Sequence, residues 1–449
     1  MRFELTKDFL DEVREMIAQN NSAFMDEKII QLHPADIAEI IDELDNDEAK
    51  YVFNHLQSEL QGDVLMELED DVRYQFVESF DTTQLATQLE NLDSDDAVDI
   101  LGELETDRQL EVISEMESEN AAQLVKLLNY DENSAGGLMQ TEFIRAKLDW
   151  PVNRCVVELR RQAEEVEKVY TIYVVDEDDR LVGFLSLKSL LFANTKTSIR
   201  DIYQDKNMVY VTTNIEAEEV GRIMDKYDLV SIPVLNLQKK LVGRITIDDI
   251  VDVIREEADK DFQMASGISE NVESSASIWR MSRSRMPWLL IGMLGGILGA
   301  QVIGNFETQI GQIPALAFFI PLVAAMGGNV GVQSSAIVVQ SIANGTNQFD
   351  SILSKVKREA GLGLLNGGVC ASVIFLVTWL LQNMTLGLSV SIALFIVIIF
   401  AAIFGTLIPL VLHKYKIDPA VATGPFITTL NDVVGLFIYF MVGMFIFGL

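Results

Sequence analysis

The last 170 residues of the chain are too apolar to fold as an ordinary soluble domain. Apolar stretches occur near 286–306, 313–343, 359–382, 387–412 and 419–448. Each is long enough to cross a hydrocarbon core of about 30 Å as a helix. We therefore predict a five-helix transmembrane domain over residues 280–449, in contact with membrane lipid.

Basic residues alternate between the loops of this region, which indicates its orientation. Lys and Arg precede the first stretch and lie between the second and third and between the fourth and fifth (Arg280, Arg283, Arg285; Lys355, Lys357, Arg358; Lys414, Lys416). The loops around Glu307 and Asn383 contain none. Because basic loops stay on the cytoplasmic side, we expect a multi-pass protein of the cell (inner) membrane with a cytoplasmic N-terminal part and an external C-terminus.

The fifth stretch contains a carboxylate, Asp432, well inside an apolar run, and no Lys or Arg follows it. A charge at that depth costs several kcal/mol and usually faces a water-filled path or a partner. The second stretch carries a polar run from Gly328 to Gln333 that includes Asn329. Each run alone is also consistent with helix packing; together they favour a shared pore lining that handles a cation.

Acidic residues are concentrated in the first 279 residues, which hold 62 Asp and Glu against 26 Lys and Arg. Such a surface repels nucleic acid and attracts cations, although it also serves simply to keep a domain soluble. The chain shows no zinc-ligand spacing and no nucleophile triad, so its sequence gives no support for an enzyme.

Apolar residues recur every twelve positions in the N-terminal region, at Leu32, Leu44, Leu56, Leu68, Phe80, Leu92, Leu104, Met116 and Leu128. Acidic or polar helix starts lie between them, for example Asp93-Ser94-Asp95-Asp96. Such residues cap helices and complement the helix dipole. One short helix per repeat cannot bury a core alone, so stacking is required. The sequence predicts an acidic helical solenoid over residues 1–137.

A duplicated strand–turn–strand pattern follows, around Tyr173–Ser186 and again around Pro233–Thr246. The two copies, 138–200 and 201–254, resemble tandem CBS domains. The resemblance implies that Thr246 and Asp249 hold the ribose of ATP or another adenine nucleotide. The first copy has Ser189 in place of the Asp, and a CBS pair without nucleotide is the alternative. A charged connecting helix and a Ser-rich linker are expected over 255–279.

The whole chain resembles the MgtE family of magnesium channels and transporters. The resemblance rests on Tyr130–Met139, on Gly328-Asn329-x-Gly331-x-Gln333, on Asp418-Pro419-Ala420 and on the segment around Asp432. It implies a homodimer in which two Asp432 carboxylates face a central pore. Asn329 and Asn431 would add oxygens around a Mg²⁺ ion that keeps several of its waters, as this ion prefers.

The resemblance also implies that cytoplasmic Mg²⁺ closes the pore by bridging acidic residues of the soluble part. The matching positions are Asp95, Asp99, Glu218, Asp228, Asp249, Asp252, Glu257, Asp261 and Asp418. Lys260 stands where a carboxylate would be expected. Three alternatives remain: a transporter of Mn²⁺ or Co²⁺, a membrane-anchored adenine-nucleotide sensor and, with the least support, a membrane enzyme.

Overall fold

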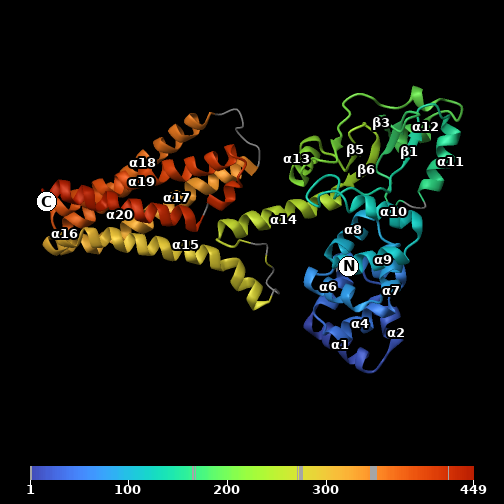
Figure 1. Cartoon of the computed structure of the whole chain (residues 1–449), viewed down its shortest axis with the longest axis horizontal. Coiled ribbons are helices and arrows are strands. Elements are labelled where there is room, and N and C mark those ends of the chain that lie inside the picture. The colour runs from blue at the N-terminus through green and yellow to red at the C-terminus, as the bar shows by residue number, and fades with distance from the viewer. Residues whose placement is uncertain are drawn as a thin grey trace. The chain divides into compact units, whose positions relative to one another are not determined.

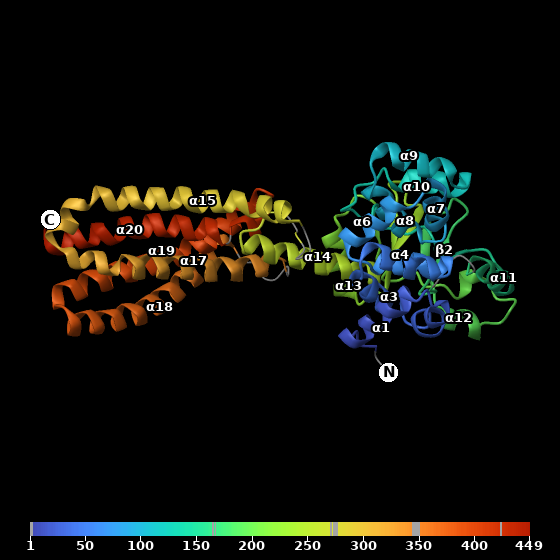
Figure 2. The same ribbon diagram turned by 90° about the horizontal axis from the view of Figure 1, so that it is seen from below.

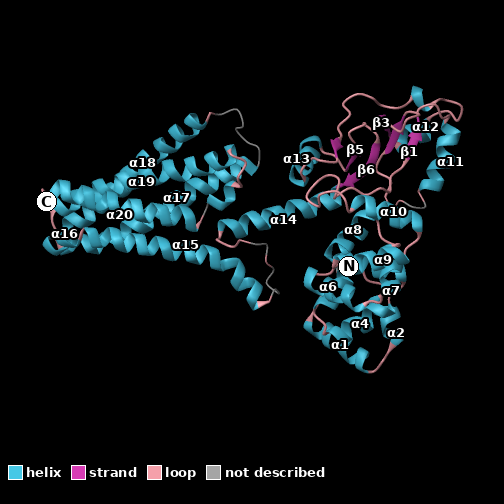
Figure 3. Ribbon diagram, viewed as in Figure 1, coloured by secondary structure: helices cyan, strands magenta, loops and turns pink. Residues whose placement is uncertain are grey.

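The computed structural model describes residues 3–163, 166, 168–269, 272, 277–343, 351–422 and 424–449. The chain divides into two compact units, Met1–Arg255 and Glu256–Leu449. The first unit contains helices and two small sheets, and the second is helical throughout the part that is described (Figure 3).

The first unit begins with a stack of short helices (Figure 1). They are α1 (Lys7–Ala18), α2 (Ser22–Phe24), the π-helical turn η1 (Met25–Ile29), α3 (Pro34–Asp42), α4 (Asn46–His55), α5 (Ser58–Glu67), α6 (Asp70–Ser79), α7 (Thr82–Leu89), α8 (Ser94–Glu103), α9 (Thr106–Glu115) and α10 (Ser118–Leu127). Helix α3 packs on α5, α5 on α7 and α7 on α9. The predicted solenoid is confirmed.

The twelve-residue repeat places its apolar residue just beyond the end of each helix. Leu56, Leu68 and Leu104 are C-cap residues with extended backbone, and each is buried. The chain therefore turns sharply there while its apolar side chain enters the core. The residue after the repeat position caps the following helix, as Asp81 does for α7. It forms a capping box, in which its side chain accepts a hydrogen bond from the backbone amide of Gln84. Such a cap satisfies amide groups that the first helical turn leaves unpaired.

The predicted duplication is also confirmed. The first copy holds β1 (Arg145–Lys147), α11 (Val152–Gln162), β2 (Ile172–Val175), β3 (Leu181–Leu185), α12 (Leu187–Phe192) and the 3-10 turn η2 (Ile199–Asp201). The second holds β4 (Val211–Thr212), α13 (Ala217–Tyr227), β5 (Ser231–Leu235) and β6 (Leu241–Thr246). In each sheet the first strand is parallel to the second and the second is antiparallel to the third.

The buried core of the helical stack continues into the second copy, where Val211, Val220 and Ile245 belong to the same cluster. The first copy has a core of its own around Ile172 and Val174. A smaller cluster that includes Tyr173 and Leu235 joins the two copies. The stack and the second copy therefore form a continuous body, which fixes α8 against the end of β6.

Helix α14 (Ile247–Ala265) follows β6 directly. It contains the charged helix that we predicted, but it begins before residue 255, because Thr246 ends β6 and Ile247 already starts the helix. Much of the Ser-rich linker before Ser277 lies outside the described residues.

The second unit contains five helices long and apolar enough to span a membrane, among the residues that the structure describes. They are α15 (Ile278–Asn305), η3–α17 (Pro314–Ala343), α18 (Ile352–Leu381), α19 (Met384–Lys414) and α20 (Pro425–Phe447). Two short segments accompany them, α16 (Glu307–Gln312) and η4 (Pro419–Ala422). Helix α20 packs against α15, α17 and α19, as both views show (Figures 1 and 2).

Small residues allow α17, α19 and α20 to approach closely. A Cβ atom at Gly331 of α17 would collide with the Asn431 side chain of α20, and one at Gly405 of α19 would collide with the Gly331 carbonyl oxygen. Close contact through glycine is the usual way to pack helices in lipid, where the hydrophobic effect gives no drive for helices to associate. These contacts hold the segment around Asp432 against the polar run of α17.

Candidate functional site

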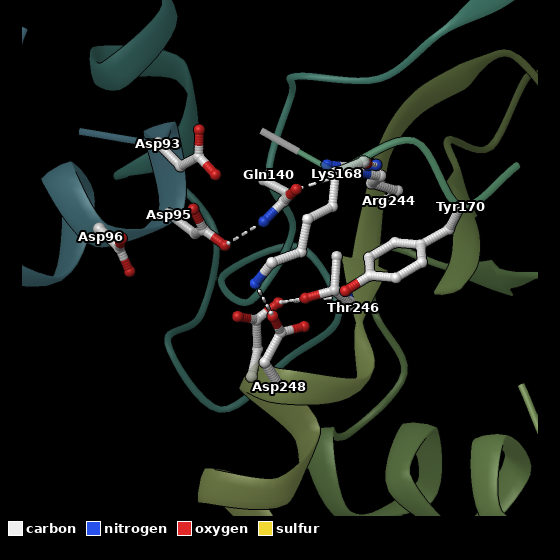
Figure 4. Close-up of a pocket in the computed structure, with 10 residues that line it drawn as sticks. Asp93, Asp95, Asp96, Gln140, Lys168, Tyr170, Arg244, Thr246 and Asp248 are labelled. Carbon is white, nitrogen blue, oxygen red and sulfur yellow. Dashed lines mark hydrogen bonds and ion pairs between the residues drawn. The ribbon is translucent and has the colours of Figure 1, made fainter. Parts of the chain in front are cut away.

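An acidic pocket of about 110 Å³ lies where α8 meets the start of α14 in the first unit (Figure 4). Among the described residues, its lining contains five carboxylates and two cationic side chains: Asp93, Asp95, Asp96, Gln140, Lys168, Tyr170, Arg244, Thr246, Asp248 and Asp249. The pocket thus brings together Asp95 and Asp249, which we predicted as sensing residues from distant parts of the sequence. It also contains Thr246 of the predicted nucleotide site.

Asp95 is held with one of its oxygens unpaired. Its Oδ2 atom accepts a hydrogen bond of 3.1 Å from the Gln140 amide, whose Oε1 in turn accepts one of 2.7 Å from Arg244 Nε. Because Arg244 only donates, the Gln140 amide must turn its nitrogen toward Asp95. Asp95 Oδ1 is buried with no hydrogen-bond partner among the described residues. A buried, unpaired carboxylate oxygen is costly unless a cation or a donor satisfies it.

Asp249 lines the same pocket from the first turn of α14. Its Oδ2 atom accepts hydrogen bonds from the hydroxyl of Thr246 at 2.6 Å and from the Thr246 amide at 3.1 Å. The predicted Thr–Asp pair therefore forms a hydrogen-bonded turn at the end of β6. In the first copy, Ser186 and Ser189 make the corresponding contact through their hydroxyls at 2.7 Å.

Three carboxylates of the pocket, those of Asp95, Asp96 and Asp249, hold protons more tightly than free carboxylates do. Burial raises the pKa of Asp95 well above its usual value, and the negative charges of Asp96 and Asp249 raise it further. Burial, followed by the charge of Asp249, raises the pKa of Asp96 to about 7. Burial also raises the pKa of Asp249, although hydrogen bonds from Thr246 oppose it. The pocket is therefore strained by its own negative charge at neutral pH.

These shifts predict how pH affects the stability of the soluble unit. Because the folded-state pKa values are raised, the folded unit binds more protons than the unfolded chain between about pH 4 and pH 7. Its free energy of unfolding should therefore fall as pH rises through 7 in Mg²⁺-free solution. Thermal unfolding of the protein in EDTA at pH 6 and pH 8 measures this, and a soluble unit that is more stable at pH 8 would contradict it.

The remaining predicted sensing residues of the first unit lie outside this pocket. Asp99 is exposed on α8, and Glu218 and Asp228 are exposed at the two ends of α13. Asp252 is exposed on α14, with its carboxylate 3.6 Å from the Arg255 guanidinium. None of these four lines the acidic pocket.

Three more predicted residues belong to the second unit. The Glu257 carboxylate lies 3.0 Å from the Lys260 ammonium. This hydrogen bond raises the pKa of Lys260, and the charges of Asp418 and Asp261 add to the shift. Asp418 also caps η4, since its Oδ1 atom accepts a hydrogen bond of 2.8 Å from the Ala420 amide. Lys260 thus lies among the carboxylates that we predicted to bind an ion.

A second pocket, of about 290 Å³, opens between α17 and α20. Its lining combines small and apolar residues with four polar ones: Ala324, Ala325, Gly328, Asn329, Val332, Gln333, Thr428 and Asp432. The structure therefore brings Asp432 and Asn329 together, in the same pocket. Gly328 permits this arrangement, because a Cβ atom there would lie 3.7 Å from Asp432 Oδ1 and 3.1 Å from Thr428 Cγ2.

Asn431 does not line this pocket, although we predicted it as a pore residue. Its side chain is buried against Gly327 and Gly331 of α17, and neither of its polar atoms has a hydrogen-bond partner among the described residues. Asn431 and Asp432 are neighbours in a helix and therefore point about 100° apart. The structure thus places Asn431 in a helix contact and leaves Asp432 in the pocket.

The end of α14 abuts the start of α20 within the second unit. Gly424, which has a positive φ of 55°, leaves no room for a side chain beside the Ala265 carbonyl oxygen, and Gly267 lies against Pro425. The Ser269 amide also donates a hydrogen bond of 2.9 Å to the Ser284 carbonyl oxygen of α15. The end of α14 therefore packs against the first turn of the helix that carries Asp432.

Sequence reasoning missed part of the acidic pocket. Asp96 could have been found, because it shares the acidic start of α8 with Asp95. Asp248 could have been found in the same way, because it shares the acidic start of α14 with the predicted Asp249. Gln140 and Lys168 carry no such signal, since only the tertiary packing of the chain brings them to the pocket. Among the described residues, no three His, Cys, Asp or Glu side chains form a ready-made metal-binding group.

The fold and its two pockets define a multi-pass membrane protein with a soluble CBS-containing unit and a carboxylate among its spans. The sequence matches the divalent cation transporter family MgtE over residues 320–442 and the MgtE intracellular N domain over 32–133. It matches the CBS domain over 135–195 and 199–256.

Curated relatives show the same family over most of the chain. The magnesium transporter MgtE of Bacillus subtilis is 35% identical over 315 residues, which are 70% of each chain. The magnesium transporter MgtE of Thermus thermophilus is 34% identical over 324 residues, 72% of each chain. The chain belongs to the MgtE family of magnesium transporters.

Two solved structures resemble the soluble part. The cytosolic domain of the Mg²⁺ channel MgtE in complex with ATP has a TM-score of 0.52 and 31% identity, covering 54% of this chain and 99% of that one. The soluble part of a magnesium transporter has a TM-score of 0.51 and 28% identity, covering 56% and 99%.

Proposed function

We propose that this protein carries Mg²⁺ across the cell membrane into the cytoplasm, along a path that passes Asp432. The observation that carries the proposal is the pocket between α17 and α20, in which an intramembrane carboxylate lies with Asn329, Gln333 and Thr428. A charged residue inside a span usually marks an ion path. The relatives that match 70% or more of this chain are named magnesium transporters.

The pocket is completed by a second copy of the chain. Ala325, Asn329 and Gln333 follow one another at helical spacing on α17, and all three are exposed on the single chain. Amide side chains on a membrane helix require a polar neighbour or water, because lipid offers no hydrogen bonds. A homodimer with α17 and α20 at its axis would place two Asp432 carboxylates across a wet path.

Mg²⁺ fits this lining better than softer or larger ions. It gives up its waters reluctantly and is usually held by one or two carboxylates with several waters retained. The described residues that line the pocket offer carboxylate, amide and hydroxyl groups, and they include no Cys or His that would favour a soft metal. Mn²⁺ and Co²⁺ share the same charge and remain the competing cargo.

Cytoplasmic Mg²⁺ also controls the path. An ion bridging Asp95 and Asp249 would satisfy the Asp95 oxygen that has no partner among the described residues. It would also relieve the repulsion that adds to the effect of burial on the pKa values of both side chains. The further sensing residues are Asp99, Glu218, Asp228, Asp252, Glu257, Asp261 and Asp418. When the ion leaves, repulsion would loosen the start of α14, whose other end abuts α20.

Adenine nucleotide is a second ligand for the soluble unit, favoured by one feature of the acidic pocket. Tyr170 lines the same space as the Thr246–Asp249 pair, and this combination suits a base and a ribose. The related cytosolic domain was solved in complex with ATP. Nucleotide binding would regulate transport and would not replace it.

Flux through the reconstituted protein tests the proposal. Vesicles that contain the protein should take up Mg²⁺, and the rate should fall as Mg²⁺ is raised on the side that carries the basic loops. Mn²⁺ or Co²⁺ added in competition distinguishes the cargo, and ATP added at fixed Mg²⁺ reveals the nucleotide effect. A vesicle flux no greater than that of protein-free vesicles would overturn the transport function.

A further inference from the structure

Lys168 has an unusual position for a surface lysine. It lies between α11 and β2 of the first CBS copy, and its ammonium reaches into the acidic pocket of the second (Figure 4). The Nζ atom is 3.3 Å from Asp248 Oδ2, and the side chain passes beside Gln140 and Tyr170. A positive charge from one CBS copy thus stands at the acidic start of α14.

The backbone of Lys168 is anchored at this place. Arg244 donates a hydrogen bond of 3.0 Å from Nη1 to the Lys168 carbonyl oxygen, while its Nε atom holds Gln140. Arg244 is itself almost fully buried. The Arg244 guanidinium therefore orients the Gln140 amide, which binds Asp95, and it also fixes the backbone of Lys168. Gln140 and Lys168 are thus both positioned at the pocket by Arg244.

An ammonium in this position has two effects on a divalent cation. It reduces the negative potential of the pocket when the ion is absent, and it repels the ion when the ion enters. The pairing of Lys168 with Asp248 does not exclude the ion, because half-exposed pairs contribute at most about 1 kcal/mol. The lysine can therefore be pushed aside, at a cost that reduces affinity.

We propose that Lys168 is a built-in competitor of the ion that the acidic pocket senses, and that it raises the Mg²⁺ concentration needed to fill the pocket. The inference rests on the proposed sensing function and deepens it. It assigns the Mg²⁺ concentration range over which the pocket fills to a residue that is not one of the carboxylates. Removing the ammonium leaves every carboxylate in place and leaves the pocket more negative.

The test is Mg²⁺ titration of the full-length protein by calorimetry. Lys168→Met keeps most of the apolar stem and removes the charge. The relevant signal is the Mg²⁺ binding that Asp95→Asn abolishes. For this signal the dissociation constant of Lys168→Met should fall about fivefold, because the variant removes a unit charge about 7 Å from a divalent ion in a water-like medium. Lys168→Arg restores a positive charge and should bind within about twofold of the unchanged protein.

Lys188→Met is the matched control, because Lys188 is an exposed lysine of α12 in the same CBS copy and does not line the pocket. It removes the same charge and should shift the dissociation constant less than about twofold, since exposed charges at a distance are screened. A purely structural role for Lys168 would weaken binding on substitution, so tighter binding separates the two explanations.

The possible outcomes are distinct. If the unchanged protein shows Mg²⁺ binding that Asp95→Asn removes, and Lys168→Met binds no more tightly than Lys188→Met, the inference about Lys168 is overturned and the sensing function stands. If no Mg²⁺ binding depends on Asp95, the sensing function fails and the role of Lys168 fails with it.

Discussion

Replacing Asp432 by Asn is expected to reduce Mg²⁺ flux at least about 100-fold. The substitution keeps the shape of the side chain and removes one negative charge per chain from the pocket between α17 and α20. A divalent cation loses about 3 kcal/mol or more of attraction when a carboxylate about 5 Å away is neutralised in a partly wet site, and each 1.4 kcal/mol is a factor of ten. Among the described residues, no other carboxylate lines this pocket.

The measurement is Mg²⁺ uptake into vesicles at equal protein density. Glu307→Gln is the matched control, because it also removes one carboxylate charge from the membrane unit, and Glu307 is exposed at the start of α16. It should leave the flux within about twofold. Size-exclusion profiles should agree for both variants, since Asn is an isostere of Asp. Equal flux from Asp432→Asn and Glu307→Gln would remove Asp432 from the ion path.

The amino-acid sequence specifies most of the fold because its periodicities are strong and local. The twelve-residue repeat predicts one short helix per unit, and Leu56, Leu68 and Leu104 occupy equivalent places at the helix ends. Apolar stretches predict five spans, and five helices of that kind are present in the described residues. Differences occur at helix ends, as in α14, where the strand β6 passes into the helix with no linker.

The candidate sites were less accessible to sequence reasoning, because they depend on contacts between distant segments. Asp95 and Asp249 share a pocket only because the helical stack and the second CBS copy have a continuous core. Asn431 was predicted as a pore residue because it adjoins Asp432 in the sequence. In the helix the two side chains point in different directions, so Asp432 faces the pocket while Asn431 contacts Gly331. Lys168 could not be assigned at all, since its flexible stem carries the charge far from its own backbone.

The second large effect is expected for Asp95→Asn, which should uncouple transport from cytoplasmic Mg²⁺. Asp95 brings to the pocket a buried carboxylate oxygen that has no partner among the described residues, and Asp249 at the start of α14 lines the same pocket. With Asn at this position, the pocket offers one carboxylate fewer to an entering ion. The repulsion between carboxylates, which the ion would relieve, is also smaller in the variant. The cytoplasmic Mg²⁺ concentration that halves the flux should rise at least about tenfold.

Recording from reconstituted protein while Mg²⁺ is stepped on the cytoplasmic side measures this concentration. Asp107→Asn removes the same charge from an exposed position on α9 and should leave the half-inhibiting concentration within about twofold. Asp95→Asn should also stabilise the soluble unit in EDTA at pH 8, since burial and the charges of Asp96 and Asp249 raise the pKa of the native carboxyl. If Asp95→Asn closes at the same Mg²⁺ concentration as the unchanged protein, the sensing ion binds elsewhere. If the variant fails to close and its soluble unit is more stable in EDTA, then the buried carboxylate lowers the stability of the unit and is required for control by Mg²⁺.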